Sequence, residues 1–197
     1  EFKYQEQVTG NAWSTGNSMN TARSQLAGAG TQTAALGFGG TTPPVSALTE
    51  QYNGTSWTEV ADLNTARRLI AGTGTQTSSL AFGGHAPSVT AATESWNGSS
   101  WTEVADLNTA RVALAAAGAD NTSALAFGGL NPPTFYANTE SWNGSSWTEV
   151  NDLNTARRDL GGNGIITSAL AYGGDTPGAT AATESWNGTS WTDVADL

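Results

Sequence analysis

Residues 93–111, TESWNGSSWTEVADLNTAR, and residues 139–157, TESWNGSSWTEVNDLNTAR, differ at one position. The motif NTAR, which ends both stretches, recurs along the chain, and so does a Gly-Gly pair that ends a short apolar run. NTAR begins at Asn20, Asn64, Asn108 and Asn154, and the Gly-Gly pairs are residues 39–40, 83–84, 128–129 and 173–174. The copies of NTAR are therefore 44, 44 and 46 residues apart. A period of this length is typical of architectures in which each repeat is one supersecondary unit.

Each repeat contains an apolar run that predicts a β-strand. The four runs read AALGFGG, SSLAFGG, SALAFGG and SALAYGG, with two large residues two positions apart and Ala or Gly between them. This alternation gives a strand one large face and one small face, which suits sheets stacked in series. We expect the large pairs to be buried between sheets: Leu36/Phe38, Leu80/Phe82, Leu125/Phe127 and Leu170/Tyr172.

Three more strands complete each predicted unit. The segment after the Arg of NTAR has an apolar residue at 26, 70, 114 or 160 and then mostly Gly and Ala, which favours a strand whose backbone lies close to its neighbours at a central axis. A helix is the alternative for LAAAGA, but the equivalent LAGAGT and IAGTGT contain too much Gly. The last two strands, around ATESW and SWTEV, are joined by Asn-Gly, a strong hairpin signal.

Four short strands in each repeat predict an all-β fold, a β-propeller built from four-stranded antiparallel blades. The pattern resembles the kelch-type repeat, in which a Gly-Gly strand is followed by a Tyr and then by a Trp. The first aromatic is Tyr52, Trp96, Trp142 or Trp186, and the second is Trp57, Trp101, Trp147 or Trp191. The chain departs from the kelch pattern in its shorter spacing between the two aromatics and in having Trp for Tyr in three copies.

The near-identical repeats are also similar to the kelch-like repeats that marine bacteria and their phages encode. That resemblance implies an extracellular or virion-surface location. A weaker resemblance, to the Asp-box turn of sialidase propellers, lacks the Asp in residues 95–101, SWNGSSW.

We expect a single domain over residues 1–197, with an N-terminal half-blade at 1–19 and repeats at 20–60, 64–104, 108–150 and 154–197. Glu6, Gly10 and Trp13 align with Glu50, Gly54 and Trp57, so the first residues match a third and a fourth strand. Four and a half units fit a ring of four or five blade positions. We expect five, closed by strands from beyond Leu197, and self-association of the 197-residue chain through its incomplete blade.

Composition excludes several classes of partner and cofactor. The net charge is −10, from 17 acidic residues against seven Lys and Arg without a basic run, which argues against nucleic acid and anionic membranes. No apolar run approaches the ~20 residues that a membrane span needs. Cysteine is absent and His85 is the only histidine, so we expect no metal site and no cofactor.

Repeated Glu, Arg and Trp residues invite a catalytic or a lectin interpretation. Paired carboxylates serve glycosidases, and exposed Trp side chains stack on sugars. However, each series recurs in equivalent surroundings, whereas an active site needs carboxylates in different ones. We therefore expect ion pairs and core contacts, and no catalytic residue, at Arg23, Arg67, Arg111 and Arg157, at Glu50, Glu94, Glu140 and Glu184, and at the second Trp series.

The segments after Gly-Gly differ in every copy: TTPPVSAL (41–48), HAPSVTAA (85–92), LNPPTFYAN (130–138) and DTPGATAA (175–182). An invariant scaffold with variable loops on one face is typical of binding modules, although drift in unconstrained loops would look the same. The candidate ligand-binding residues are Thr42, Pro43, His85, Pro87, Asn131, Phe135, Tyr136 and Asp175. The sequence thus predicts a non-enzymatic recognition or structural display module for a protein or glycan ligand. The alternatives are a lectin with repeated glycan pockets and a sialidase-type hydrolase.

Overall fold

The computed structural model describes residues 16–197, and the predicted half-blade at residues 1–19 lies outside this range except for its last four positions. The described residues form strands and turns without any helix, which confirms the all-β prediction. It follows that this part of the chain contains no helix long and apolar enough to cross a membrane.

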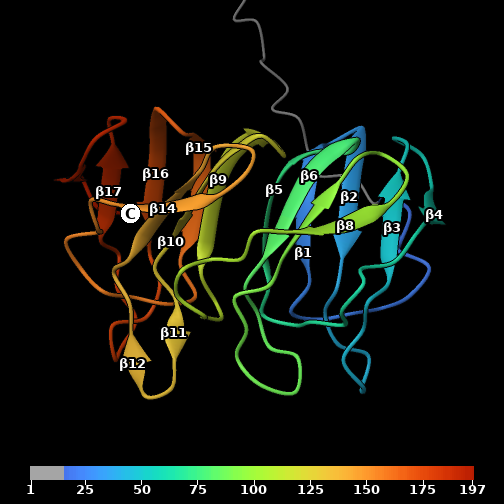
Figure 1. Ribbon diagram of the computed structural model, residues 1–197, viewed down its shortest axis with the longest axis horizontal. Coiled ribbons are helices and arrows are strands. Elements are labelled where there is room, and N and C mark those ends of the chain that lie inside the picture. The colour runs from blue at the N-terminus through green and yellow to red at the C-terminus, as the bar shows by residue number, and fades with distance from the viewer. Residues whose placement is uncertain (1–15) are drawn as a thin grey trace, which may run out of the picture.

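Four four-stranded antiparallel sheets follow one another along the chain (Figure 1). Sheet 1 contains β1 (Ala27–Thr31), β2 (Ala34–Phe38), β3 (Thr49–Tyr52) and β4 (Trp57–Glu59). Sheet 2 contains β5 (Ala71–Thr75), β6 (Ser78–Phe82), β7 (Thr93–Trp96) and β8 (Trp101–Val104). Sheet 3 contains β9 (Ala115–Asp120), β10 (Ser123–Phe127), β13 (Thr139–Trp142) and β14 (Trp147–Val150), and sheet 4 contains β15 (Gly161–Ile165), β16 (Ser168–Tyr172), β17 (Thr183–Trp186) and β18 (Trp191–Val194). A two-stranded hairpin, β11 (Leu130–Asn131) and β12 (Thr134–Phe135), protrudes at the bottom of Figure 1.

The third and fourth strands of each sheet are joined by the predicted Asn-Gly turn. In sheet 3 the Oδ1 atom of Asn143 accepts hydrogen bonds from the backbone N–H groups of Ser145 and Ser146, both at 3.0 Å. Gly144 follows with a φ of 94°, a conformation that glycine adopts at little cost. The turn sets the register in which Trp142 faces Trp147 across the hairpin.

The first strands of the sheets lie side by side at the centre of the molecule. β1 packs beside β5, β5 beside β9, and β9 beside β15. Just before these strands, backbone hydrogen bonds run from one sheet to the previous one: Leu69 N–H to Gln25 O at 3.0 Å, Ala113 N–H to Leu69 O at 3.1 Å, and Asp159 N–H to Ala113 O at 2.9 Å. Within residues 16–197, β15 and β1 do not pack in this way, and no bond joins Gln25 N–H to Asp159 O.

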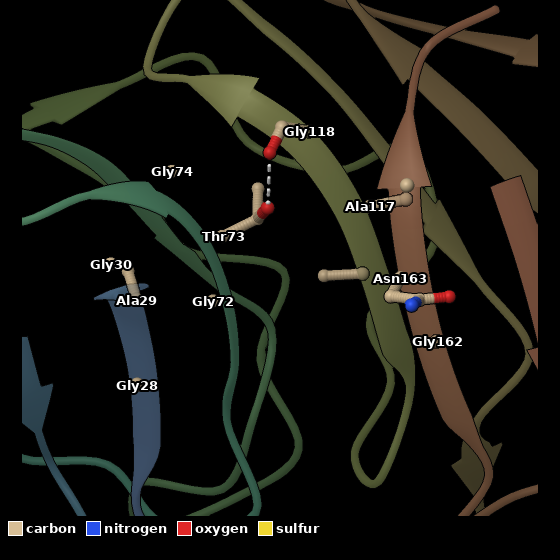
Figure 2. A pocket seen from close by; sticks show the side chains of 12 residues that line it. Gly28, Ala29, Gly30, Gly72, Thr73, Gly74, Ala117, Gly118, Gly162 and Asn163 are labelled. Carbon is tan, nitrogen blue, oxygen red and sulfur yellow. Dashed lines mark hydrogen bonds between the residues drawn. The ribbon is translucent and has the colours of Figure 1, made fainter. Parts of the chain in front are cut away.

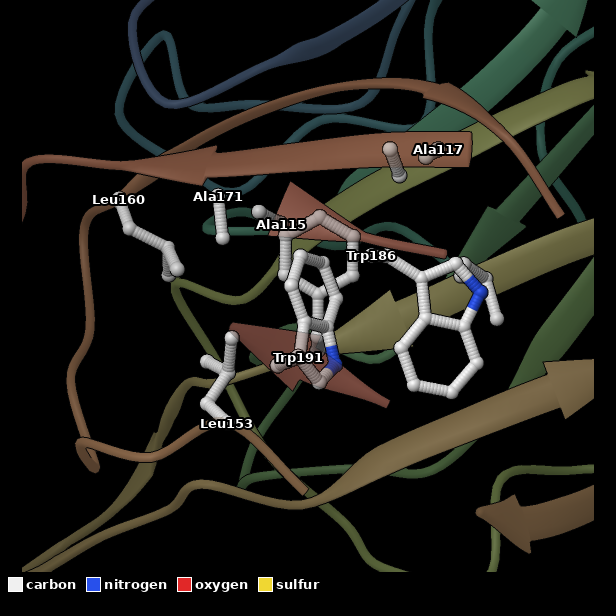
Figure 3. Packing of buried hydrophobic residues seen from close by; sticks show 10 residues of the cluster. Ala115, Ala117, Leu153, Leu160, Ala171, Trp186 and Trp191 are labelled. Atoms are coloured by element: carbon white, nitrogen blue, oxygen red, sulfur yellow. The ribbon is translucent and has the colours of Figure 1, made fainter. Parts of the chain in front are cut away.

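Successive sheets stack through aromatic rings. The Phe of each second strand meets the fourth-strand Trp of the next sheet, with ring centroids 4.9 Å apart in Phe38–Trp101, Phe82–Trp147 and Phe127–Trp191. The same Trp donates its indole N–H to a Thr of the previous sheet, as in Trp191 to Thr139 at 3.0 Å. Figure 3 shows the interface of sheets 3 and 4, where Trp186 and Trp191 lie among Ala115, Ala117, Leu153, Leu160 and Ala171.

The prediction that all four large pairs are buried is correct for three repeats and wrong for the last. Leu36, Leu80 and Leu125 and the Phe two residues after each are at most 1% exposed, because the next sheet covers them. Leu170 is 39% exposed and Tyr172 is half-buried, since no further sheet follows sheet 4 within the described residues. Trp57, on the opposite outer face in sheet 1, is likewise half-buried, whereas Trp101, Trp147 and Trp191 are buried.

Candidate functional site

The repeated Arg and Glu residues form buried ion pairs. Their N···O distances are 3.1 Å for Arg23–Glu50, 2.9 Å for Arg67–Glu94, 2.9 Å for Arg111–Glu140 and 3.0 Å for Arg157–Glu184, and all eight side chains are at most 1% exposed. Each Arg lies in the connection that leads into a sheet, and its Glu lies on the third strand of that same sheet. A side chain without solvent contact is not open to a substrate, so these carboxylates belong to the framework.

Additional hydrogen bonds hold each pair in place. Arg111 donates from Nη1 to the carbonyl oxygens of Gly128 at 2.8 Å and Asn138 at 2.5 Å. Glu140 accepts from Asn108 N–H at 2.6 Å and from Thr109 N–H at 3.3 Å. Burial lowers the pKa of Arg111, and the adjacent Glu140 carboxylate opposes that shift. A buried charge with several partners is costly to disrupt, so the pair fixes the connection to its sheet.

The same connections bind the preceding sheet through the backbone. Gly40 N–H donates to Arg67 O at 2.7 Å, and Arg67 N–H donates to Ser46 O at 3.2 Å. A Cβ atom on Gly39, whose φ is 67°, would lie 2.7 Å from that Arg67 carbonyl oxygen. The Gly-Gly pair is therefore needed both for its backbone conformation and for the close approach of the connection.

The repeated Trp side chains do not form a sugar-stacking surface. Trp96, Trp142 and Trp186 are at most 3% exposed, and the fourth-strand Trp side chains of sheets 2 to 4 are buried against the previous sheet. Trp96, Trp142 and Trp186 each donate the indole N–H to a backbone carbonyl of their own sheet, as Trp142 does to Asn121 O at 2.9 Å. These six Trp side chains are core.

The variable segments lie together at one end of the sheets, which we call the loop face (residues 41–48, 85–92, 130–138 and 175–182, with the connections beside them). Backbone bridges join each segment to the connection that enters the same sheet: Ser24 with Thr41, Arg68 with His85, Val112 with Leu130, and Arg158 with Asp175. In Figure 1 this face is at the bottom, where the β11–β12 hairpin protrudes. The structure thus brings the eight predicted binding residues to one side of the molecule.

Some of the eight residues are free for contact and others have structural partners. Pro43 and Pro87 are exposed. The backbone N–H of Thr42 donates to Pro44 O at 3.0 Å, and Asn131 donates from Nδ2 to Ala110 O at 3.3 Å. Tyr136 uses its backbone to bond Gly129 O at 2.9 Å and to accept from Arg157 N–H at 3.2 Å.

His85 and Asp175 occupy equivalent positions with different surroundings. The Nδ1 atom of His85 is buried without a hydrogen-bond partner in the described chain. Asp175 accepts from Arg158 at 2.9 and 3.1 Å, and this contact and the N–H of Gly178 hold the pKa of the Asp175 carboxyl below its usual value. Arg158 in turn lies over the Phe135 ring, 5.5 Å from its centroid.

Sequence reasoning missed a second variable set on the loop face. The two residues after each NTAR read Ser-Gln, Arg-Leu, Val-Ala and Arg-Asp, and they change in every copy as the loops do. The second residue of each pair has a positive φ of 51° to 57° although none is glycine: Gln25, Leu69, Ala113 and Asp159. With the four apolar residues that follow them, they line a cavity of about 270 Å³ at the centre of the loop face.

A second cavity, of about 250 Å³, lies further along the inner strands (Figure 2). Its wall is almost entirely Gly, Ala and backbone, with Thr73, whose hydroxyl donates to Gly118 O at 2.9 Å, and Asn163 as the larger side chains. The residues after NTAR therefore line the first cavity only, whereas the second contains a position that differs among the repeats, Ala29, Thr73, Ala117 or Asn163.

Exposed positive charge in residues 16–197 is confined to the loop face. Four of the six Arg residues in this range are buried in the ion pairs, and the other two are Arg68 and Arg158. Asp175 neutralises Arg158, whereas the only side-chain bond of Arg68 in the described chain is to Gln25 Oε1, at 3.2 Å. Arg68 is thus a cation without an acidic partner there, in a protein of net charge −10.

No protein-family profile matches the chain, and no curated protein matches it significantly. The described residues also contain no group of three or more His, Asp or Glu side chains arranged to hold a metal ion.

Proposed function

We propose that this protein is a β-propeller of five blade positions that acts as a non-enzymatic recognition module and binds its ligand on the loop face. The observation that carries the proposal is the distribution of differences among the repeats. Side chains of nearly identical units differ at the loops and at the residues after NTAR, which backbone bridges bring to one face, and the second residue after each NTAR lines a cavity there. The Asn-Gly turns at the other end read only NGTS or NGSS. Variable residues gathered on one end of a rigid scaffold are the usual arrangement of a binding surface.

The loop face also provides the groups that recognition needs. Arg68 supplies a charge for an anionic group, and Phe135 supplies an apolar surface within the same face. Aromatic and Arg side chains contribute most to the stability of protein interfaces. We therefore propose a protein segment or a glycan that carries at least one acidic group as the ligand.

Two alternative functions, a lectin and a hydrolase, were suggested by repeated side chains that the structure shows to be buried. The lectin interpretation relied on repeated Trp side chains, six of which are buried. The hydrolase interpretation relied on repeated Glu side chains, all four of which are buried against Arg. These six Trp and four Glu side chains lack the solvent access that a sugar-binding or catalytic role requires.

A binding screen tests the proposal. The 197-residue chain is screened against a random-peptide display library and a glycan array, and the affinity of each enriched binder is measured by calorimetry. Arg68→Ala and Phe135→Ala should each weaken binding at least tenfold, and Ser99→Ala, in an exposed Asn-Gly turn, should leave it unchanged. The proposal is wrong if Ser99→Ala weakens binding while both loop-face variants bind normally.

A further inference from the structure

Two positions face each other in every repeat of the loop face, the first residue after NTAR and the first residue after Gly-Gly. Each such pair exchanges two backbone hydrogen bonds, as Arg68 N–H does with His85 O at 3.1 Å and His85 N–H with Arg68 O at 2.8 Å. Residues paired in this way carry their side chains on the same side of the backbone, so the two side chains are neighbours. The four pairs are Ser24 with Thr41, Arg68 with His85, Val112 with Leu130, and Arg158 with Asp175.

Three of the four pairs are chemically matched. The pair in sheet 3 consists of two buried apolar side chains, and the pair in sheet 1 consists of two small hydroxyl side chains. In sheet 4, Arg158 and Asp175 are a cation and an anion 2.9 Å apart. The pair in sheet 2 is different, because Arg68 faces His85, a side chain that never carries negative charge. Sheet 2 thus presents an arginine where sheet 4 neutralises one.

Sheet 4 shows how a carboxylate binds an arginine at this position. Oδ2 of Asp175 accepts from Nε of Arg158 at 3.1 Å and from Nη2 at 2.9 Å, so the carboxylate lies on one edge of the guanidinium. Oδ1 of Asp175 accepts from the N–H of Gly178 within the loop. A second carboxylate, that of Asp159, lies 3.6 Å from Nε of Arg158.

The corresponding edge of Arg68 is open among the residues that the structure describes. Arg68 donates from Nη1 to Oε1 of Gln25 at 3.2 Å, whereas its Nε and Nη2 groups have no acceptor in residues 16–197 and are not buried. Leu69 stands where Asp159 stands in sheet 4, so the second acid is missing as well. Arg68 therefore leaves open the edge that Asp175 occupies on Arg158.

The loops of sheets 2 and 4 follow the same backbone path, so the difference between the two sites lies in the side chains. Thr90 N–H donates to Gly84 O, and in sheet 4 Thr180 N–H donates to Gly174 O, both at 3.0 Å. An acidic residue in place of the sheet 2 histidine would therefore start from the same backbone position as the native aspartate of sheet 4.

We propose that Arg68 anchors a ligand carboxylate, which binds the Nε and Nη2 edge as Asp175 binds Arg158. Arginine holds a carboxylate through two N–H groups of one planar fork, a geometry that lysine lacks. Sheet 2 thus carries the open form of a site that sheet 4 fills with its own side chain, and sheets 1 and 3 have no cation there. Because the chain fills its own site with an aspartate, the ligand group is an aspartate side chain of a peptide. This inference rests on the proposed recognition function, to which it adds the position and chemistry of one ligand group.

Arginine NMR tests the assignment without a selected ligand. The Nε–Hε signals of the 197-residue chain are followed while an aspartate with blocked α-amino and α-carboxyl groups is added, to a concentration on the order of 50 mM, which detects a millimolar Kd. We expect the Arg68 signal to shift and saturate, and the Arg158 signal to stay, because Asp175 occupies its edge. Glucuronate and inorganic phosphate are titrated in parallel. An unmoved Arg68 signal, or tighter binding of glucuronate or phosphate than of the blocked aspartate, would overturn the proposal.

Exchanges between the two sheets provide matched variants. His85→Asp gives sheet 2 the acid of sheet 4 and should raise the Kd at Arg68 about tenfold or more, because the site is then filled from within. Ser99→Asp adds the same charge in an exposed Asn-Gly turn and should leave that Kd nearly unchanged. The reverse exchange, Asp159→Leu with Asp175→His, should make the Arg158 signal respond as well. A Kd that His85→Asp leaves unchanged, or that Ser99→Asp raises equally, would contradict a site at Arg68.

A conservative variant keeps the test decisive if an exchanged loop does not fold. Arg68→Lys retains the charge and removes the fork, so the Kd, followed by the backbone amide signals of residues 68 and 85, should rise about fivefold or more. An unchanged Kd would show that charge alone attracts the carboxylate. The two proposals also fail separately. A peptide or glycan selected on the loop face that binds normally to the His85→Asp variant would refute the carboxylate site and leave the recognition function intact, whereas selected ligands that ignore the loop face would refute that function even if the blocked aspartate binds.

Discussion

Sheets 3 and 4 contain nearly the same second strand, SALAF in one and SALAY in the other, but they differ in what covers it. Leu125 is fully buried beneath sheet 4, whereas Leu170 is 39% exposed. The two leucines lie between alanines in their own strands and pair with equivalent serines, Ser141 and Ser185, on the third strand, while their first-strand partners are Ala117 and Asn163. Burial here is therefore a property of the stack and not of the strand.

The largest expected effect compares these two leucines directly. Leu125→Ala should lower the free energy of unfolding by about 2–5 kcal/mol, because it opens a cavity in a packed interface. Leu170→Ala should cost less by at least ~1 kcal/mol, since Leu170 is 39% exposed where Leu125 is fully buried. Urea denaturation of both variants measures the difference, and equal losses would show that sheet 4 is covered as completely as sheet 3.

A comparison of Gly72 in sheet 2 with Gly28 in sheet 1 tests the end of the stack at sheet 1. A Cβ atom on Gly72 would lie 2.3 Å from Cζ of Phe38, while the nearest atom to one on Gly28 is the carbonyl oxygen of Leu36, at 3.3 Å. Both glycines face the carbonyl of their own sheet at a similar distance, so the Phe ring is the difference between them. Gly72→Ala should cost about 1–3 kcal/mol from overpacking. Gly28→Ala should cost clearly less in the same denaturation experiment, and an equal cost would mean that an aromatic ring also covers Gly28.

The residues just before the inner strands, whose backbones bond between sheets, predict a smaller and stabilising change. Ala113 has a φ of 53°, where an L-residue is strained by roughly 1–2 kcal/mol, and its N–H bonds Leu69 O at 3.1 Å. Ala113→Gly should relieve the strain and keep the bond, for a net gain of about 0.5–1 kcal/mol after the entropy cost of glycine. Ala117→Gly, at a buried strand position with ordinary φ, is the control and should destabilise. A loss of stability in both variants would contradict the strain argument.

The smallest effect concerns the loops of sheets 2 and 4, where His85 and Asp175 hold equivalent places. The hydrogen bond from Arg158 lowers the pKa of Asp175 in the folded chain. Its contribution to stability is therefore fully present above the unfolded pKa, about 3.9, and is lost as the pH falls through the lower folded value. Asp175→Asn should be slightly less stable than the parent at neutral pH, and the gap should close in strong acid. A gap that persists in strong acid would rule out the ion pair as its origin.

The repeat period made the fold predictable from the sequence. Strand positions follow from the alternation in the Leu-x-Phe runs, and the hairpins follow from Asn-Gly, because both are local signals. The exposure of Leu170 could not follow from local sequence, since the segment is nearly identical to its buried equivalent. It requires knowledge of which sheet comes next.

The candidate site was predictable only in part. Variation among the repeats located the segments after Gly-Gly, and the structure places them on one face. The same criterion applied to the residues after NTAR would have identified Arg68 and Arg158, but an apolar residue nearby suggested only a buried strand. Their proximity to the loops depends on backbone bridges between segments far apart in the chain, such as Arg68 with His85, which no local pattern encodes.

Amide hydrogen exchange at the second glycine of each Gly-Gly pair tests the central claim, that the contacts of each repeat depend on the repeat that follows. Gly129 N–H donates to Arg157 O in the next connection at 2.8 Å, as Gly40 and Gly84 do to Arg67 and Arg111. Gly174 N–H has no such partner among residues 16–197. The account predicts that in NMR exchange experiments Gly174 loses its amide proton faster than Gly40, Gly84 and Gly129 by a factor on the order of 100 or more, as expected for local opening without a hydrogen bond. Protection of Gly174 equal to that of the other three would contradict it.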